Sequence, residues 1–196
     1  MLSCKPHPMS LSLKILALGT SLTATPLWVE RLRTDVQNCA GRDVEIEVVA
    51  RNGANSRWGL SQIQHVIDAK PDVVTIEFAV NDASLRHLVS LGESRKNHEN
   101  IIALIRRALP AAKIVLFAVS PTWGARGVWI RPWLTDYYAL YPRLADTLQV
   151  SFVDARPAWD KYDAGSAIPD GLHPTGQAMS EFVAPVLAKA ICSSAS

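Results

Sequence analysis

The chain has 196 residues, of which hydrophobic residues make up 48% and charged residues 19%. These proportions are typical of a globular domain and exclude an intrinsically disordered chain. Twenty basic residues against 18 acidic ones give a formal net charge of +2, and no basic run indicates binding to nucleic acid. No apolar stretch reaches the roughly 18 residues of a membrane span.

The length of the chain predicts one domain, which we expect to cover residues 11–196. Residues 9–18 faintly resemble the core of a signal peptide, but Lys14 interrupts them and no cleavage motif follows. We therefore expect residues 1–10 to form a short disordered leader and the protein to be cytoplasmic.

The cysteines predict neither a disulfide framework nor a metal-binding pair. Cys4, Cys39 and Cys192 are odd in number and far apart in the sequence, so we expect free thiols. Zinc-protease, calcium-loop, Walker and dinucleotide-binding motifs are absent from the sequence. We expect no metal site and no cofactor.

The first half of the chain predicts alternating strands and helices. A strand at residues 13–18 precedes a helix at 27–40, whose apolar residues recur at helical spacing. A second strand follows at 44–50 and a second helix at 59–69. The apolar run 72–80 predicts the third strand, because Pro71 ends the helix before it.

The same alternation continues in the second half. A helix is predicted at residues 97–109, a strand at 113–119, a helix at 133–148 and a short strand at 150–153. Near-continuous apolar strands separated by helices indicate a parallel sheet covered on both faces. The fold class is therefore α/β, a three-layer α/β/α sandwich.

A last helical pattern covers residues 175–191 and contains Pro185. Proline lacks the N–H that a helix interior requires, so we expect a kink there or a helix that starts later than its pattern.

Polar residues follow four of the predicted strands, at the edge where parallel sheets place functional loops. Ser21 follows the first strand, Gly53 the second and Asn81 the third, and the pair Asp170 and His173 follows the fifth across a loop. Each of these signals alone is more often a turn or a helix cap. Together they indicate a serine nucleophile with a histidine base, an aspartate that orients the base, and three donors for an oxyanion.

In these blocks the chain resembles the SGNH (GDSL-type) hydrolase family. Ser21 lies in GTSL, Gly53 in RNGANSRWG, Asn81 in AVND and His173 in DGLH. The resemblance implies a flavodoxin-like five-stranded sheet of order 2-1-3-4-5 and no cofactor. It also implies that Ser21 is the nucleophile, His173 the base and Asp170 its partner, with an oxyanion hole formed by Ser21, Gly53 and Asn81. The chain departs from the family pattern at Thr20, where an aspartate is usual, and at Ala79, where a glycine is usual.

The segment 121–133 is rich in tryptophan and arginine. It is expected either to fold back and bury its aromatic side chains or to form a wall over the site. In the second case the substrate contacts would include Arg51, Arg57, Trp123, Arg126, Trp129 and Arg131, with the arginines binding an anionic part of the substrate. The polar connection 83–99 is a second candidate for a mobile flap.

The function expected from these features is that of a serine esterase acting on a small-molecule, carbohydrate or lipid ester. A thioesterase or O-acyltransferase would use the same residues. From other classes, a non-catalytic flavodoxin-like module that binds phosphate or nucleotide at residues 19–23, or an interaction protein with exposed tryptophans, remains open. The pair Asp170 and His173 favours the enzyme, because a phosphate cradle does not need it.

Overall fold

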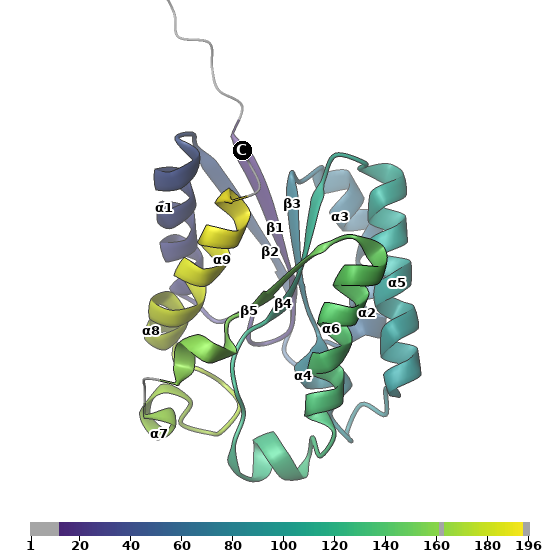
Figure 1. Ribbon diagram of the computed structural model, residues 1–196, viewed down its shortest axis with the longest axis vertical. Helices are drawn as coiled ribbons and strands as arrows, with labels where there is room; N and C mark the ends of the chain where they lie inside the picture. The colour runs from purple at the N-terminus through teal and green to yellow at the C-terminus, as the bar shows by residue number, and fades with distance from the viewer. Residues whose placement is uncertain (1–11, 161–162, 194–196) are drawn as a thin grey trace, which may run out of the picture.

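The computed structural model describes residues 12–160 and 163–193, which form a sheet between two layers of helices (Figure 1). The strands are β1 (Leu13–Gly19), β2 (Val44–Ala50), β3 (Val73–Glu77), β4 (Lys113–Ala118) and β5 (Ser151–Asp154). All neighbouring strands are parallel, in the order β2-β1-β3-β4-β5. The predicted architecture and strand order are confirmed. The predicted leader lies outside the described residues.

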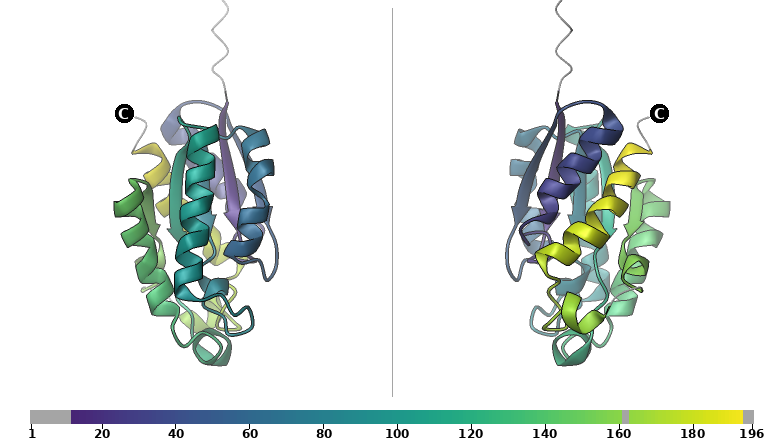
Figure 2. Two further views of the ribbon diagram at one scale, coloured as in Figure 1. Left: turned by 90° about the vertical axis from the view of Figure 1, so that its right-hand side faces the viewer. Right: turned by 90° about the vertical axis from the view of Figure 1, so that its left-hand side faces the viewer.

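Helices cover both faces of this sheet (Figure 2). One face carries α1 (Trp28–Ala40) and α9 (Ala184–Cys192), and the other carries α2 (Ser56–Ser61), α3 (Ile63–Ala69), α5 (Leu91–Ala108) and α6 (Leu134–Leu148). Three shorter helices lie near the carboxyl ends of the strands, namely α4 (Ala79–Asp82), α7 (Ala164–Ala167) and α8 (Gly176–Ala178). The loops that follow the strands therefore lie together at one end of the molecule.

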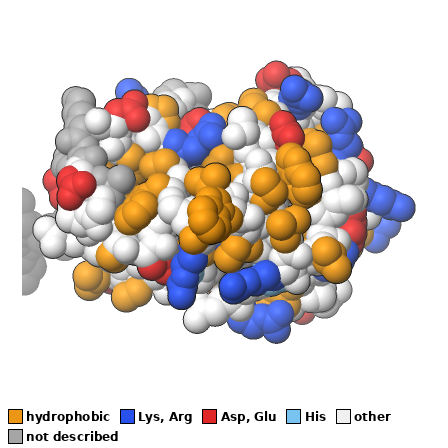
Figure 3. Space-filling view, turned by 90° about the horizontal axis from the view of Figure 1, so that it is seen from below, with side chains coloured by type: hydrophobic (Ala, Val, Ile, Leu, Met, Phe, Trp, Pro, Cys, Tyr) orange, Lys and Arg blue, Asp and Glu red, His pale blue; other side chains and the backbone are white. Residues whose placement is uncertain are grey.

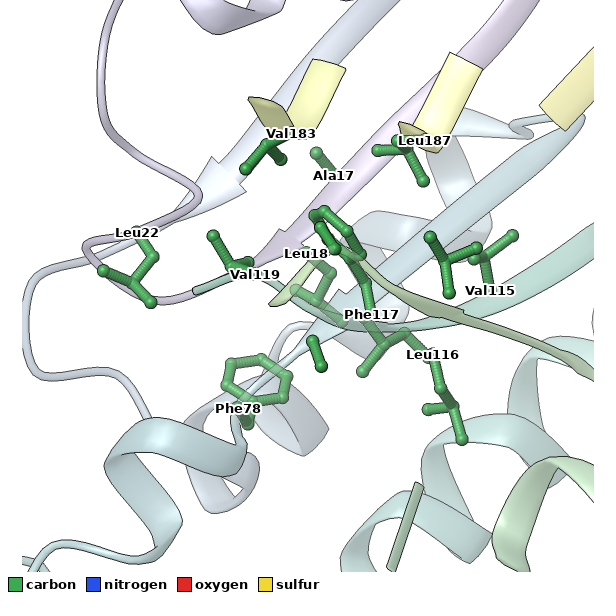
Figure 4. Close-up of a cluster of buried hydrophobic side chains, with 14 of the residues drawn as sticks. Ala17, Leu18, Leu22, Phe78, Val115, Leu116, Phe117, Val119, Val183 and Leu187 are labelled. Carbon is green, nitrogen blue, oxygen red and sulfur yellow. The ribbon is translucent and has the colours of Figure 1, made fainter. Parts of the chain in front are cut away.

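The core lies on both faces of the central strands, since successive strand residues point to opposite faces. Figure 4 shows Val183 and Leu187 close to Ala17 of β1 on one face, with Leu116 of β4 on the other. All four are buried. The edge strand β2 exposes several of its residues, as the alternation of apolar residues with glutamates predicts.

The third strand is shorter than the apolar run 72–80 predicts, because it ends at Glu77 and the chain then turns into α4. The hydroxyl of Tyr141 accepts hydrogen bonds from the backbone N–H groups of Phe78 and Ala79, at 2.8 and 3.0 Å. A side chain of α6 thus takes the donors that would have extended the sheet, and the turn brings Asn81 to the strand end.

Two helices also differ from their predicted bounds. The pattern 59–69 is split at Gln62 into α2 and α3, and α2 begins earlier because the Asn55 side chain accepts a hydrogen bond from the Trp58 N–H. Helix α5 begins at Leu91 rather than at residue 97, since Ser90 caps it. Much of the connection 83–99, expected as a flap, is therefore helical.

The C-terminal pattern behaves as Pro185 predicts. A π-helical turn at Met179–Val183 interrupts it, and regular α-helix resumes at Ala184, with the proline in the first turn of α9.

A disulfide was not predicted. Cys39 at the end of α1 and Cys192 at the end of α9 form this bond across 153 residues of sequence. The expectation of free thiols was therefore wrong for these two cysteines, and Cys4 lies outside the described residues.

Candidate active site

The four predicted strand-end blocks meet in one pocket of about 660 Å³. Ser21, Gly53, Asn81 and His173 all line it. They follow β1, β2 and β3 or lie beyond β5, so the pocket sits at the carboxyl edge of the sheet, where parallel α/β folds bind their ligands.

Ser21, His173 and Asp170 form a continuous chain of hydrogen bonds. The His173 Nε2 atom lies 3.1 Å from the Ser21 hydroxyl oxygen, and its Nδ1 atom lies 2.7 Å from Asp170 Oδ2. With Nδ1 donating to the carboxylate, Nε2 is free to accept a proton from the serine. In this geometry the imidazole is oriented to take the proton of the serine hydroxyl.

The loop around Asp170 is built to hold a carboxylate. Its Oδ1 atom accepts the backbone N–H groups of Leu172 and His173, at 3.0 and 2.7 Å. Gly171 between them has φ +77°, and a Cβ there would lie 2.2 Å from the Trp123 carbonyl oxygen, so only glycine fits. Burial opposes ionisation, but the hydrogen bonds from His173 and Leu172 outweigh it and hold the pKa of Asp170 well below its ordinary value.

Three of the residues that line this pocket have an N–H group available for a hydrogen bond. The backbone N–H groups of Ser21 and Gly53 donate no hydrogen bond to any described residue. The Asn81 amide nitrogen donates one hydrogen bond to the Ala54 carbonyl at 2.7 Å and has a second N–H. Arg131 Nη2 donates to Asn81 Oδ1 at 3.3 Å, which fixes the amide with its nitrogen on the other side.

The carboxyl group of Glu77, which contacts the residues on either side of Ser21 and Leu22, was not predicted to belong to the site. Glu77 ends β3 beside Gly19 of β1 and is almost fully buried. Its Oε2 atom accepts hydrogen bonds from the N–H and hydroxyl of Thr20, at 3.2 and 2.6 Å, and from the Thr23 hydroxyl at 3.3 Å. Burial raises the pKa of Glu77 to about 7, although these hydrogen bonds counteract the rise. The only sequence signal was an acid inside an apolar strand.

The residues predicted to contact substrate divide into two groups. Arg126 and Arg131 line the pocket, and Arg126 also pairs with Asp170 at 2.8 Å. Arg57 and Arg51 do not line it. Arg57 donates to Glu93 and to backbone carbonyls, and the Arg51 guanidinium lies 5.1 Å from the centre of the Trp58 ring.

The tryptophans of the segment 121–133 are neither buried against the next helix nor part of the pocket wall. Trp129 is 79% exposed, and Trp123 and Trp133 are also exposed. The segment borders the pocket through Arg126, Ile130 and Arg131 instead. Figure 3 views the molecule from this end and shows hydrophobic side chains gathered there, with lysine or arginine side chains beside them.

Two further residues of this pocket were missed. Arg86 and His87, in the loop after α4, line it together with the neighbouring Ser84. The sequence placed them in a polar connection, and no motif marked them.

Of the part of the chain that the structure describes, no helix is long and apolar enough to cross a membrane.

A five-stranded parallel sheet of this strand order, with helices on both faces, is the fold of the SGNH hydrolases. The chain belongs to the GDSL-like lipase/acylhydrolase family, whose sequence profile matches residues 17–179. The family resemblance stated from the sequence is confirmed. No curated protein matches the chain in sequence.

Solved structures share the fold at low sequence identity. A lipase/acylhydrolase from Enterococcus faecalis superposes with a TM-score of 0.77 and 22% identity, over 93% of this chain and 96% of the other. A variant of an acetyl xylan esterase from Geobacillus stearothermophilus has a TM-score of 0.77 and 18% identity, over 91% and 94%. A carbohydrate acetylesterase family member from Sinorhizobium meliloti has a TM-score of 0.71 and 19% identity, over 91% and 97%.

Proposed function

We propose that this protein is a serine esterase that hydrolyses a carboxylic ester through an acyl-enzyme on Ser21. The observation that carries the proposal is the 3.1 Å contact between His173 Nε2 and the Ser21 hydroxyl, with Asp170 on the other ring nitrogen. A serine hydroxyl is a poor nucleophile unless a base takes its proton, and this contact supplies the base.

In the proposed reaction, His173 Nε2 takes the hydroxyl proton while Ser21 Oγ forms a bond to the carbonyl carbon of the ester. The tetrahedral intermediate collapses, its C–O bond to the alcohol breaks, and the imidazolium gives its proton to the leaving alcohol. Water then attacks the acyl-enzyme, with His173 as base, and releases the acid and the free serine. Asp170 keeps the imidazole in the tautomer that accepts at Nε2 and stabilises the imidazolium.

The negative charge of the intermediate needs donors that no other group occupies. We assign this role to the N–H groups of Ser21 and Gly53 and to the second N–H of the Asn81 amide. Donors aimed in advance at the developing oxyanion stabilise the transition state more than the substrate. The assignment is supported by the fact that the two backbone N–H groups donate to no residue within 12–160 or 163–193.

The substrate is proposed to be a small-molecule, carbohydrate or lipid ester, with Arg126 and Arg131 among its contacts and Trp123 and Trp129 on the nearby exposed surface. Hydrolysis of thioesters or transfer of the acyl group to another hydroxyl would use the same side chains. The structural similarity of this chain to an acetyl xylan esterase supports the choice of an oxygen ester.

The cytoplasmic location expected from the sequence stays a prediction. The disulfide between Cys39 and Cys192 weighs against it, because structural disulfides are rare in reducing compartments.

The test is incubation with a fluorophosphonate probe and with p-nitrophenyl acetate, using the wild type, Ser21→Ala and His173→Ala. We expect covalent labelling and ester hydrolysis in the wild type, neither reaction in Ser21→Ala, and strongly reduced rates in His173→Ala. Equal labelling of Ser21→Ala would refute the nucleophile. If the wild type neither reacts with the probe nor cleaves esters, the rival function, a non-catalytic phosphate- or nucleotide-binding module, gains support.

A further inference from the structure

The charged side chains that line the pocket are all basic. Its ionisable lining residues are Arg86, His87, Arg126, Arg131 and His173, and none of the described residues that line it is acidic. Two acidic residues adjoin the lining residues, and both accept hydrogen bonds. Asp170 accepts hydrogen bonds from His173 and Arg126, and Asp82 accepts from Ser56 and Ser94. Arg126 is therefore paired with a carboxylate, whereas Arg86 and Arg131 form no ion pair with any described residue.

Arg131 is the central element of this surface. It is 7% exposed, and its acceptors are the carbonyl oxygens of Val80 and Arg126 and the side-chain oxygen of Asn81. A guanidinium has five N–H donors, so two remain for a ligand, and no described residue forms an ion pair with Arg131. A nearly buried arginine without a carboxylate partner is unusual, because burial of an unpaired charge is costly.

Arg86 supplies a second uncompensated cation. Its side chain is exposed at the pocket, and among the described residues no side-chain hydrogen bond or ion pair holds it. The pKa of His87 is lowered, and burial is the largest cause. The charges of Arg131, Arg57 and Arg86 lower it further, while the charge of Asp82 raises it. The two arginines line the same pocket from different segments, Arg86 from the loop after α4 and Arg131 from the segment 121–133.

We propose that Arg86 and Arg131 form a subsite for an anionic group of the substrate, so that the enzyme acts on esters that carry a carboxylate or phosphate on the acyl part or on the alcohol part. The inference rests on the proposed esterase function. Guanidinium groups bind carboxylate and phosphate through charge-assisted, often bidentate hydrogen bonds. Because Arg131 also contacts Asn81, the anion would lie close to the proposed oxyanion hole and would fix the ester carbonyl relative to Ser21.

The experiment compares pairs of esters matched in size that differ in one charge. For the acyl part, the pair is the p-nitrophenyl monoester of adipic acid and a p-nitrophenyl ester of the same chain length that ends in an isopropyl group. For the alcohol part, the pair is para-acetoxybenzoate and para-acetoxybenzamide. In the wild type we expect kcat/KM to favour the anionic ester of at least one pair by about 10-fold or more, and the preference to shrink as salt is added. The pair in which the anionic ester is preferred indicates whether the acyl part or the alcohol part of the substrate carries the charge.

Arg86→Gln is the variant of choice, since the Arg86 side chain makes no described contact that the fold needs. We expect it to lower the anionic-to-neutral ratio about 3- to 10-fold. Arg42→Gln is the control, because Arg42 borders a separate pocket near the start of β1 and its loss should leave the ratio unchanged. Equal rates for both members of both pairs, or a ratio that Arg86→Gln leaves unchanged, would overturn the subsite.

A binding measurement separates this proposal from the proposed function. Calorimetric titration of Ser21→Ala with the two adipate-type esters and the two acetoxy compounds requires no turnover. Tighter binding of an anionic member, weakened by Arg86→Gln, supports the subsite even if no ester is cleaved. If the neutral p-nitrophenyl acetate is hydrolysed while neither anionic member binds more tightly, the esterase stands and the subsite falls.

Discussion

The Glu77 carboxylate accepts a 2.6 Å hydrogen bond from the hydroxyl of Thr20, the residue immediately before the proposed nucleophile. The same Thr20 oxygen accepts the N–H of Leu22 at 3.1 Å, so the loop closes around Ser21. The family pattern usually has an aspartate at position 20. In this chain a hydroxyl stands there, and the carboxyl group comes from the neighbouring strand β3.

This contact predicts a pH dependence of stability. In the folded protein burial raises the pKa of Glu77 from 4.5 to about 7, so the folded state binds the proton more tightly than the unfolded state. The contribution of Glu77 to stability is therefore full below about pH 4.5 and is lost as the pH rises to about 7. We expect the free energy of unfolding of the wild type, relative to Glu77→Gln, to fall by about 2–3 kcal/mol between about pH 5 and pH 8.

Urea unfolding of both proteins at each pH measures this difference, in which the titration of the histidines cancels. Glu93→Gln is the matched control, because the hydrogen bond from Arg57 lowers the pKa of Glu93 and keeps it ionised over the whole range. A constant difference between the wild type and Glu77→Gln would contradict the prediction.

The assignment of Asn81 predicts a specific kinetic defect. In Asn81→Ala we expect kcat for p-nitrophenyl acetate to fall roughly 100- to 1,000-fold with a smaller change in KM, because one oxyanion donor is lost in the transition state. Asn97→Ala also removes a buried amide, one that donates to Ser56 at 2.9 Å, but it lies outside the pocket and should keep kcat near that of the wild type. Similar losses of kcat in the two variants would show a general structural effect.

Tyr141 predicts a large loss of stability on removal of one oxygen atom. Its hydroxyl accepts the N–H groups of Phe78 and Ala79 and lies 3.1 Å from His98 Nε2, all of them buried. Tyr141→Phe leaves two buried donors without an acceptor, so we expect the free energy of unfolding to fall by about 2–4 kcal/mol.

Tyr138→Phe is the comparison on the same helix. It removes a single hydrogen bond, from the hydroxyl to the Ser120 carbonyl at 2.9 Å, and we expect a loss of about 1 kcal/mol. Denaturant unfolding measures the loss of unfolding free energy in both variants. A smaller loss for Tyr141→Phe than for Tyr138→Phe would argue against Tyr141 as the acceptor that holds the chain after β3.

The disulfide predicts a dependence on reductant. Because Cys39 and Cys192 close a loop of 153 residues, reduction should lower the free energy of unfolding by about 2–4 kcal/mol, seen as a lower Tm in dithiothreitol. The double variant Cys39→Ser/Cys192→Ser should show the lower Tm with or without reductant. Alkylation of both cysteines in denatured, unreduced wild-type protein would exclude the bond.

Much of the fold was predictable because the signals for strands and helices are local. The buried run of β1 and the alternation in β2 are each read from about seven consecutive residues. The prediction failed where a distant side chain intervened. Residues 78–80 are as apolar as a strand, yet Tyr141 of α6 takes two of their N–H donors.

The residues of the candidate site were likewise predictable only where their sequence signal is local. Ser21, Gly53, Asn81, Asp170 and His173 were identified because each lies in a short motif at a predicted strand end, and the structure brings them to one place. Other features of the site became visible only in the tertiary structure, namely the support from Glu77 and the two pocket residues in the loop after α4.

By itself, the sequence determined the layered α/β fold and the motif residues of the candidate site, since periodicity and turn chemistry act between near neighbours, and its resemblance to a known family implied the order of the strands. The tertiary structure alone decided that Cys39 reaches Cys192, that Glu77 lies under Thr20, and that Arg86 faces the same pocket as Arg131. Such contacts join residues far apart along the chain, so they exist only once the helices have packed on the sheet.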